Sequence, residues 1–155
     1  MSGHPVLRFA VATFGTWESL RNTLHDLQAG GLAIETFNCL GLQRVLAGKR
    51  LTASPDKTVG LQELAFPDSV ELLGCTSGPL ADCLTRRLRA GTPSLEAALS
   101  RWLIPRHAAL VQQTVERGQI SLWVQLFDND DERRAYQTLL ANSSNSVGVH
   151  DLIPE

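Results

Sequence analysis

VLRFAVATFGTWESLRNTLHDLQAGGLAIETFNCL, residues Val6–Leu40, contains a strand pattern, a helix pattern and a second strand pattern, in that order. The same order recurs in QISLWVQLFDNDDERRAYQTLLANSSNSVGVHDL, residues Gln119–Leu152. Each such unit buries one face of its strands under its helix and leaves the other face in need of cover. The sequence therefore predicts an α/β (α+β) chain in a ferredoxin-like sandwich, with two helices on one face of a mainly antiparallel sheet.

Local signals mark the boundaries within the first stretch. Apolar residues alternate with small or polar ones between Val6 and Phe14, which is the two-residue period of a strand. Thr16 is placed to cap the following helix, and Gly30–Gly31 supplies the positive φ that ends it. Leu32–Leu40 is then expected to form the return strand of the unit.

The second stretch follows an insertion, residues 41–118, within a single domain of residues 1–155. Ile120–Phe127 alternates as a strand, and Ser146–Leu152 is expected to be the last strand. The first part of the insertion carries turn signals and short apolar runs, of which Val70–Leu73 suits an edge hairpin. Three helices are expected after it: Pro79–Ala90, a helix that Thr92–Pro93 opens and that carries Leu95 to Leu103, and Arg106–Arg117.

The alternation also predicts an apolar second face on the sheet. Small and aromatic side chains are expected to project away from the two crossover helices, and a solvated face does not normally carry so much apolar surface. Either the inserted helices or a second subunit must cover this face. We favour a partner subunit, so the sequence predicts a homodimer with these interface residues: Ala10, Ala12, Phe14, Trp123 and Phe127.

Composition excludes several classes of function. The formal net charge of −2 is too balanced for the positive field that nucleic-acid binding uses. No apolar run approaches the roughly 20 residues that cross a bilayer, so an integral membrane protein is not expected. The three cysteines Cys39, Cys75 and Cys83 lack CxxC spacing, and Met1–Pro5 leads into a strand rather than a secretory signal. A cytoplasmic location fits best.

Part of the chain resembles a bacterial general-stress family, the heat-induced stress protein domain. In that family a helix precedes an Ile-Pro step, and a second helix ends in Gly before an alternating strand that stops at an acidic turn. Ser94–Asp128 follows this pattern around Ile104–Pro105 and Gly118, and Phe9–Leu32 is similar to the family's first strand and helix. Residues 41–91 lack the glycine-zipper segment that family members commonly carry. The resemblance implies a ferredoxin-like module without known catalytic residues.

No residue pattern predicts a cofactor, a metal site or a catalytic residue, and the best candidate nucleophile is Cys75. It precedes an expected helix N-terminus, where amide dipoles lower a thiol pKa, although a buried structural cysteine explains it more simply. The four histidines form no closely spaced ligand pair, so a zinc site would have to be assembled by the fold. The acidic run Asp128–Glu132 lacks the later ligands of a calcium loop and suits a helix cap.

Three functions remain open. The first is a non-enzymatic interaction or scaffolding module that acts in a stress response. The second is a small-molecule binder or enzyme with a pocket between the sheet and the inserted helices, lined by Cys75, Trp102, His107 and Trp123. The third is a peripheral membrane protein that uses the basic stripe of Arg86, Arg87 and Arg89 beside a row of leucines.

Overall fold

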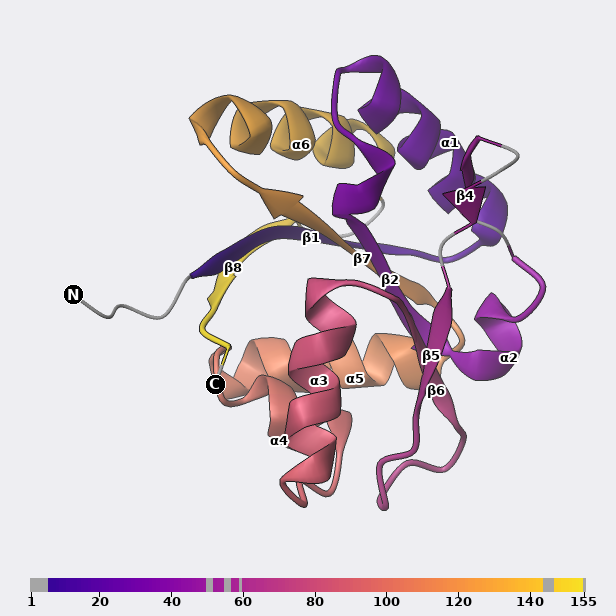
Figure 1. Cartoon of the computed structure of the whole chain (residues 1–155), viewed down its shortest axis with the longest axis vertical. Helices are drawn as coiled ribbons and strands as arrows, with labels where there is room; N and C mark the ends of the chain where they lie inside the picture. Colours follow the sequence, from indigo (N-terminus) through magenta and orange to yellow (C-terminus); the bar gives the residue numbers. More distant parts are fainter. Residues whose placement is uncertain (1–5, 50–51, 55–56, 59, 144–146, 155) are drawn as a thin grey trace.

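The computed structural model describes residues 6–49, 52–54, 57–58, 60–143 and 147–154. The chain is a mixed α/β structure whose six-stranded antiparallel sheet, ordered β5-β6-β2-β7-β1-β8, lies between two groups of helices (Figure 1). A separate two-stranded sheet pairs β3 with β4. The strands are β1 (Leu7–Phe14), β2 (Phe37–Leu42), β3 (Thr52–Ser54), β4 (Lys57–Thr58), β5 (Leu61–Leu64), β6 (Leu73–Thr76), β7 (Ile120–Leu126) and β8 (Gly148–Leu152). The helices are α1 (Trp17–Ala29), α2 (Gln43–Leu46), α3 (Pro79–Arg89), α4 (Leu95–Leu99), α5 (Pro105–Glu116) and α6 (Asn129–Asn142).

Both crossover helices begin at side-chain caps, as predicted. Thr16 caps α1, since its Oγ1 accepts a hydrogen bond from the backbone N–H of Ser19 at 3.1 Å. Asp128 caps α6, since its Oδ1 accepts from the backbone N–H of Asp131 at 2.8 Å. Further acidic residues in the first turn of α6 complement the helix dipole there. The cap interpretation of the acidic run is therefore confirmed.

The return strand of the first unit starts later than predicted. β2 begins at Phe37 rather than Leu32, because the chain first makes a short 3-10 turn. The backbone N–H of Thr36 and its hydroxyl both donate to the carbonyl oxygen of Ala33, at 3.0 and 2.6 Å. This local hydrogen bonding competes with the extended conformation, and the alternation of apolar residues does not reveal it.

The insertion contains the three expected helices, but the middle one is shorter than predicted. α4 is capped by Ser94, whose Oγ accepts from the backbone N–H of Ala97 at 3.1 Å, and not by Thr92. The insertion also adds the β5–β6 hairpin to one edge of the sheet. Only Leu73 of the run Val70–Leu73 lies in that hairpin, and Val70 is 94% exposed in the preceding loop.

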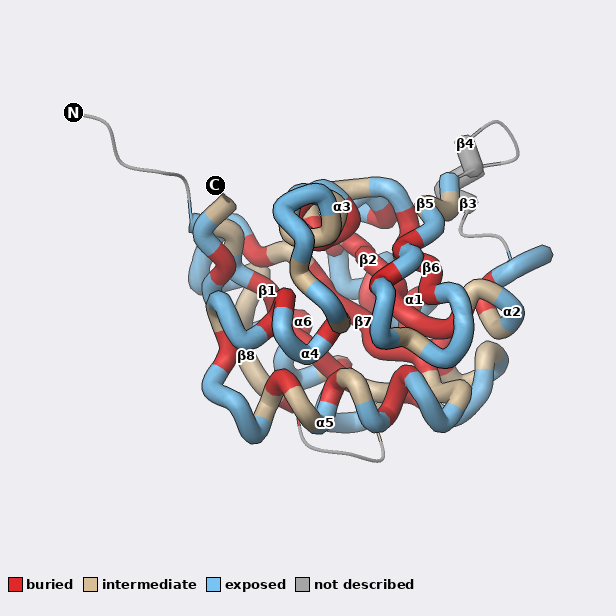
Figure 2. The backbone as a smooth tube through the Cα atoms, turned by 90° about the horizontal axis from the view of Figure 1, so that it is seen from below, coloured by how far each residue is buried: buried red, intermediate tan, exposed pale blue. Residues whose placement is uncertain are grey.

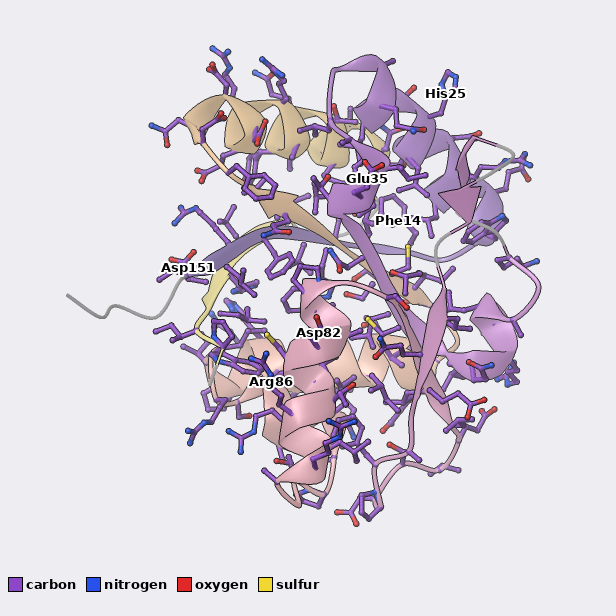
Figure 3. All side chains as sticks on the ribbon, viewed as in Figure 1. Phe14, His25, Glu35, Asp82, Arg86 and Asp151 are labelled. Atoms are coloured by element: carbon purple, nitrogen blue, oxygen red, sulfur yellow. The ribbon has the colours of Figure 1, made fainter. Side chains whose placement is uncertain are left out.

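The sheet has one apolar core on each face, and their membership corrects the predicted second face. In the antiparallel register of β1 and β7, Val11 lies opposite Trp123 and Ala12 lies opposite Leu122. Directly opposed residues share a face. Trp123 therefore lies away from the crossover helices, as expected, but Ala10, Ala12 and Phe14 pack beneath α1 and α6, where Figure 3 shows Phe14 beside α1. Phe127 lies beyond the end of β7 and is 68% exposed.

The inserted helices cover the face on which a partner subunit was expected. α3, α4 and α5 lie across it, and buried positions recur along each helix where it meets the sheet (Figures 1 and 2). Trp123 is 0% exposed within this single chain. The proposed interface is therefore wrong for Ala10, Ala12, Phe14 and Trp123, because all four are buried within the chain. A homodimer through another surface stays a prediction.

Candidate functional site

Cys75 lies on β6 and is completely buried, so it does not have the environment of a nucleophile. Burial raises its pKa well above the ordinary value, and the charges of Cys39 and Asp82 raise it further. Burial also raises the pKa of Cys39 to about 12. This burial agrees with the buried structural cysteine that the sequence favoured, and it does not support the alternative of a thiol activated by the N-terminus of α3.

In the folded protein we expect iodoacetamide to alkylate Cys75 at least about tenfold more slowly than in the unfolded chain, because only the thiolate reacts. Burial also raises the pKa of Cys83, but the charge of Arg86 acts in the opposite direction, so Cys83 should react before Cys75. Peptide mapping by mass spectrometry measures the three rates, and guanidinium chloride at denaturing concentration provides the control in which they converge. Faster labelling of Cys75 than of Cys83 near neutral pH would contradict this assignment.

The other predicted pocket residues are divided among different places. Trp102 is half-buried beside α3, where it lines a shallow hollow of about 170 Å³ with Cys83, and its Nε1 donates to the carbonyl oxygen of Ile153 at 3.0 Å. Trp123 is fully buried under the inserted helices. His107 lines a different hollow, which lies between α5 and the strands β1 and β8. The predicted single pocket is therefore not formed.

His107 belongs to a hollow of about 190 Å³ between α5 and the β1–β8 edge of the sheet. The α5 residues that line it recur every three or four positions and so share one face of the helix. Gly148 and His150 are two apart on β8 and so point to the same face of the sheet. We call this the histidine hollow, and its lining is Val11, Thr13, His107, Leu110, Val111, Thr114, Val147, Gly148 and His150.

Two imidazoles meet in the histidine hollow. The ring centroids of His107 and His150 are 5.2 Å apart, with an angle of 67° between the planes. The ring of His150 also lies 6.2 Å from that of Trp123. A Cβ on Gly148 would come within 3.0 Å of His150 Nε2, so this glycine leaves room for the ring. Neither imidazole has a hydrogen-bond partner among the residues that the structure describes.

The electrostatic surroundings favour neutral His150 near pH 7. Burial lowers the pKa of His150, the neighbouring His107 lowers it further, and Asp151 acts in the opposite direction. Asp151 follows His150 on the strand and so points to the other face, where its Oδ2 lies 3.2 Å from Nη1 of Arg8 (Figure 3). The nine residues that line the histidine hollow include no carboxylate.

His107 was predicted from the sequence as a lining residue, but His150 was not. The alternation of the last strand carried part of the missing information, because His150 pairs with Phe9 across the β1–β8 register and so faces the same core. The rest of the missing information was the position of α5 against this edge of the sheet. No local pattern encodes it, because it depends on how the insertion folds back over the sheet.

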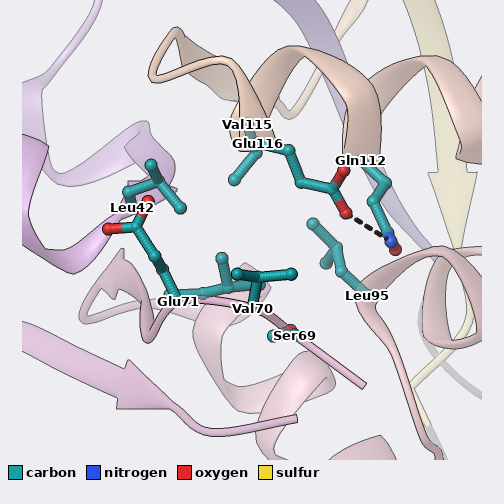
Figure 4. Close-up of a pocket in the computed structure, with 9 residues that line it drawn as sticks. Leu42, Ser69, Val70, Glu71, Leu95, Gln112, Val115 and Glu116 are labelled. Atoms are coloured by element: carbon teal, nitrogen blue, oxygen red, sulfur yellow. Dashed lines mark hydrogen bonds between the residues drawn. The ribbon is translucent and has the colours of Figure 1, made fainter. Parts of the chain in front are cut away.

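A second hollow, of about 220 Å³, lies on the other side of α5 (Figure 4). Half or more of its lining is apolar, and the side chains of Gln112, Glu116 and Glu71 are engaged with one another or with a neighbour. Gln112 Nε2 donates to Glu116 Oε1 at 2.8 Å, and Arg44 Nε lies 2.6 Å from Glu71 Oε1. It is lined by Leu42, Ser69, Val70, Glu71, Leu73, Leu95, Gln112, Val115 and Glu116.

The basic stripe of α3 does not lie beside exposed leucines. Leu80 and Leu84 are 0% exposed in the core beneath α3, so they are not available for insertion into a lipid surface. The stripe is explained by the packing of α3, whose leucines contact the core while the arginines lie beside them. Within the described residues, no helix is long and apolar enough to cross a membrane.

Over the same described part of the chain, no three His, Cys, Asp or Glu side chains are grouped so as to hold a metal ion. Comparison of the chain with family models, curated proteins and solved structures finds no match. The resemblance to the general-stress family therefore stays a prediction.

Proposed function

We propose that this protein binds a small organic molecule, of about the size of one ring, in the histidine hollow. The observation that supports this most is the pair of half-buried imidazoles, His107 and His150, which have no hydrogen-bond partner in the described chain and meet at one hollow. Their ring nitrogens are not among the buried side-chain atoms that lack a partner, so they stay available to water or to a ligand that enters the hollow.

The size and walls of the hollow support a small ligand. Its volume of about 190 Å³ exceeds the roughly 150 Å³ of an apolar protein cavity that accepts benzene. Val11, Leu110, Val111 and Val147 supply apolar contact for such a ring. Thr114 offers no free nucleophile, since its hydroxyl donates to the backbone carbonyl oxygens of Leu110 and Val111. The apolar contacts therefore support binding, and Thr114 supplies no free hydroxyl for covalent catalysis.

The interaction or scaffolding function has less support, because the inserted helices bury the sheet face on which it was expected. The predicted homodimer is tested by the mass of the protein in solution, measured by light scattering. A monomer would overturn the predicted homodimer, whereas a dimer would require an interface outside the two cores.

We also propose that the core of the fold is ferredoxin-like. Four strands support this: β8, β1, β7 and β2 are neighbours in that order, and each adjacent pair is antiparallel. They form the order 4-1-3-2 when numbered along the chain, and the crossover helices α1 and α6 pack together on one face. An experimental structure with another strand order would overturn this assignment.

Phenol is the probe that tests the binding function. We expect it to bind with a dissociation constant of about 1 mM, as suits a ligand of this size. Two-dimensional ¹H–¹⁵N NMR should show shifts of the backbone amides around His107, Thr114 and His150. Leu110 is 51% exposed beside the hollow, so L110W should fill the entrance and weaken binding at least about tenfold.

The matched control is Q113W, which places the same bulky side chain on the same helix, at an exposed position that does not line the hollow. Phenol should shift the amides of Q113W as in the wild-type protein. Equal shifts in L110W and Q113W, or shifts confined to residues outside the histidine hollow, would overturn the proposed site.

A further inference from the structure

We propose that the ligand of the histidine hollow is a small organic anion, a one-ring carboxylate, whose binding brings a proton onto the His107–His150 pair. This inference rests on the proposed function, because it names the class of molecule that the same site takes. It depends on three features of the site: the charge that the hollow can acquire, the arrangement of the two rings, and the apolar walls.

The charge that the lining residues can acquire is positive. Two imidazoles can be protonated, while threonine, glycine and aliphatic residues supply the rest of the lining and no carboxylate is among them. From α5 the titratable group that faces His150 is His107. From β1 and β7 the neighbouring rings are Phe9 and Trp123, which carry no charge. Asp151 lies on the other face of β8, where its carboxylate forms an ion pair with Arg8.

The contact between the rings explains why an anion and a proton would bind together. Burial lowers the pKa of His150 and the neighbouring His107 lowers it further, so the hollow without a ligand favours the neutral form of this ring near pH 7. A carboxylate in the hollow, beside the ring pair, would offset both effects and accept charge-assisted hydrogen bonds from imidazolium N–H groups. The anion therefore prefers the protonated pair, and by linkage its affinity rises as the pH falls.

The apolar walls distinguish an organic anion from an inorganic one. Val11, Leu110, Val111 and Val147 offer contact to carbon atoms and no hydrogen bond from their side chains. Acetate carries the carboxylate without the ring, and benzyl alcohol carries the ring without the charge. Benzoate combines both features, so the three probes separate the contributions of charge and apolar contact.

Calorimetric titration of the whole chain at about pH 5.5 and about pH 8 tests the inference, since free histidine titrates between these values and benzoate is ionised at both. We expect benzoate to bind at least about tenfold more tightly at the lower pH, with proton uptake visible as a dependence of the heat on the buffer. Benzyl alcohol should show no change with pH, and acetate should bind more weakly than benzoate.

The variants His107→Gln and His150→Gln should each reduce the dependence on pH, and the double variant should abolish it while benzyl alcohol still binds. Thermal unfolding and the amide spectrum establish that each variant is folded. If neither ring compound binds at either pH, the proposed function itself fails. If benzoate and benzyl alcohol bind equally at both values, the binding function stands and the anion inference is overturned.

Discussion

Replacement of Trp123 by alanine is expected to lower the free energy of unfolding by about 3–5 kcal/mol, the usual cost of truncating a fully buried aromatic side chain. Trp123 is 0% exposed, and its ring packs edge-on against Phe9 at 5.7 Å between centroids. Its Nε1 also donates to Ser121 Oγ at 2.9 Å, so the variant leaves a cavity and an unpaired hydroxyl. Urea unfolding followed by circular dichroism at equilibrium measures the change.

Trp102→Ala is the matched control, because Trp102 is only half-buried. We expect this control to cost less than half as much as Trp123→Ala. Trp123→Glu gives the sharper test of the fold, since a buried unpaired carboxylate should leave the chain unfolded. A folded Trp123→Glu monomer derived from a wild-type dimer would instead mean that a partner subunit covers this face, and that α3, α4 and α5 do not.

The second large effect is expected at Gly78, which caps α3 with a φ of +158°. A Cβ at this position would meet Asn38 Oδ1 at 2.7 Å. Asn38 is 1% exposed, and its Nδ2 donates to the carbonyl oxygens of Thr36 and Trp123, both at 3.2 Å. Its amide therefore cannot move away without losing buried hydrogen bonds. We expect Gly78→Ala to lower the free energy of unfolding by about 2–3 kcal/mol, by backbone strain and lost hydrogen bonds.

Two other glycines provide controls for Gly78→Ala. Gly15 has open space around it and no positive φ, so Gly15→Ala should change the free energy of unfolding by no more than about 0.5 kcal/mol. Gly91 has a φ of +89° but also open space, so Gly91→Ala isolates the backbone contribution, of about 1 kcal/mol. Denaturant unfolding of all three variants separates steric contact from strain. A Gly78→Ala variant no less stable than Gly91→Ala would contradict the close contact with Asn38.

The helix boundaries in this chain followed from local signals. Thr16 and Asp128 each bind a backbone N–H three residues ahead, and such contacts do not depend on the rest of the fold. The late start of β2 at Phe37 was missed because the competing hydrogen bonds of Thr36 leave no trace in the pattern of apolar residues. Ser94 similarly displaced the predicted cap at Thr92, because these two residues, only two positions apart, have the same capping chemistry.

The sheet faces were predicted less well, because alternation within one strand does not say which side the helices cover. Trp123 was correctly placed away from the crossover helices, but Ala10 and Ala12 were placed with it. The β1–β7 register decides which β1 residues share the face of Trp123, because it sets Val11 opposite Trp123. A shift of one residue exchanges the two faces of a strand, so only the pairing across strands fixes the membership of each core.

The sequence by itself determined the α/β class, the order of strands and helices in the two terminal units, and the caps of their helices, because these depend on periodicity and on contacts a few residues apart. Only the tertiary structure decided that the insertion covers the second face, that Cys75 is buried, and that His107 meets His150. Each of these depends on contacts between segments far apart in the chain, and such contacts are made by packing, which no local pattern encodes.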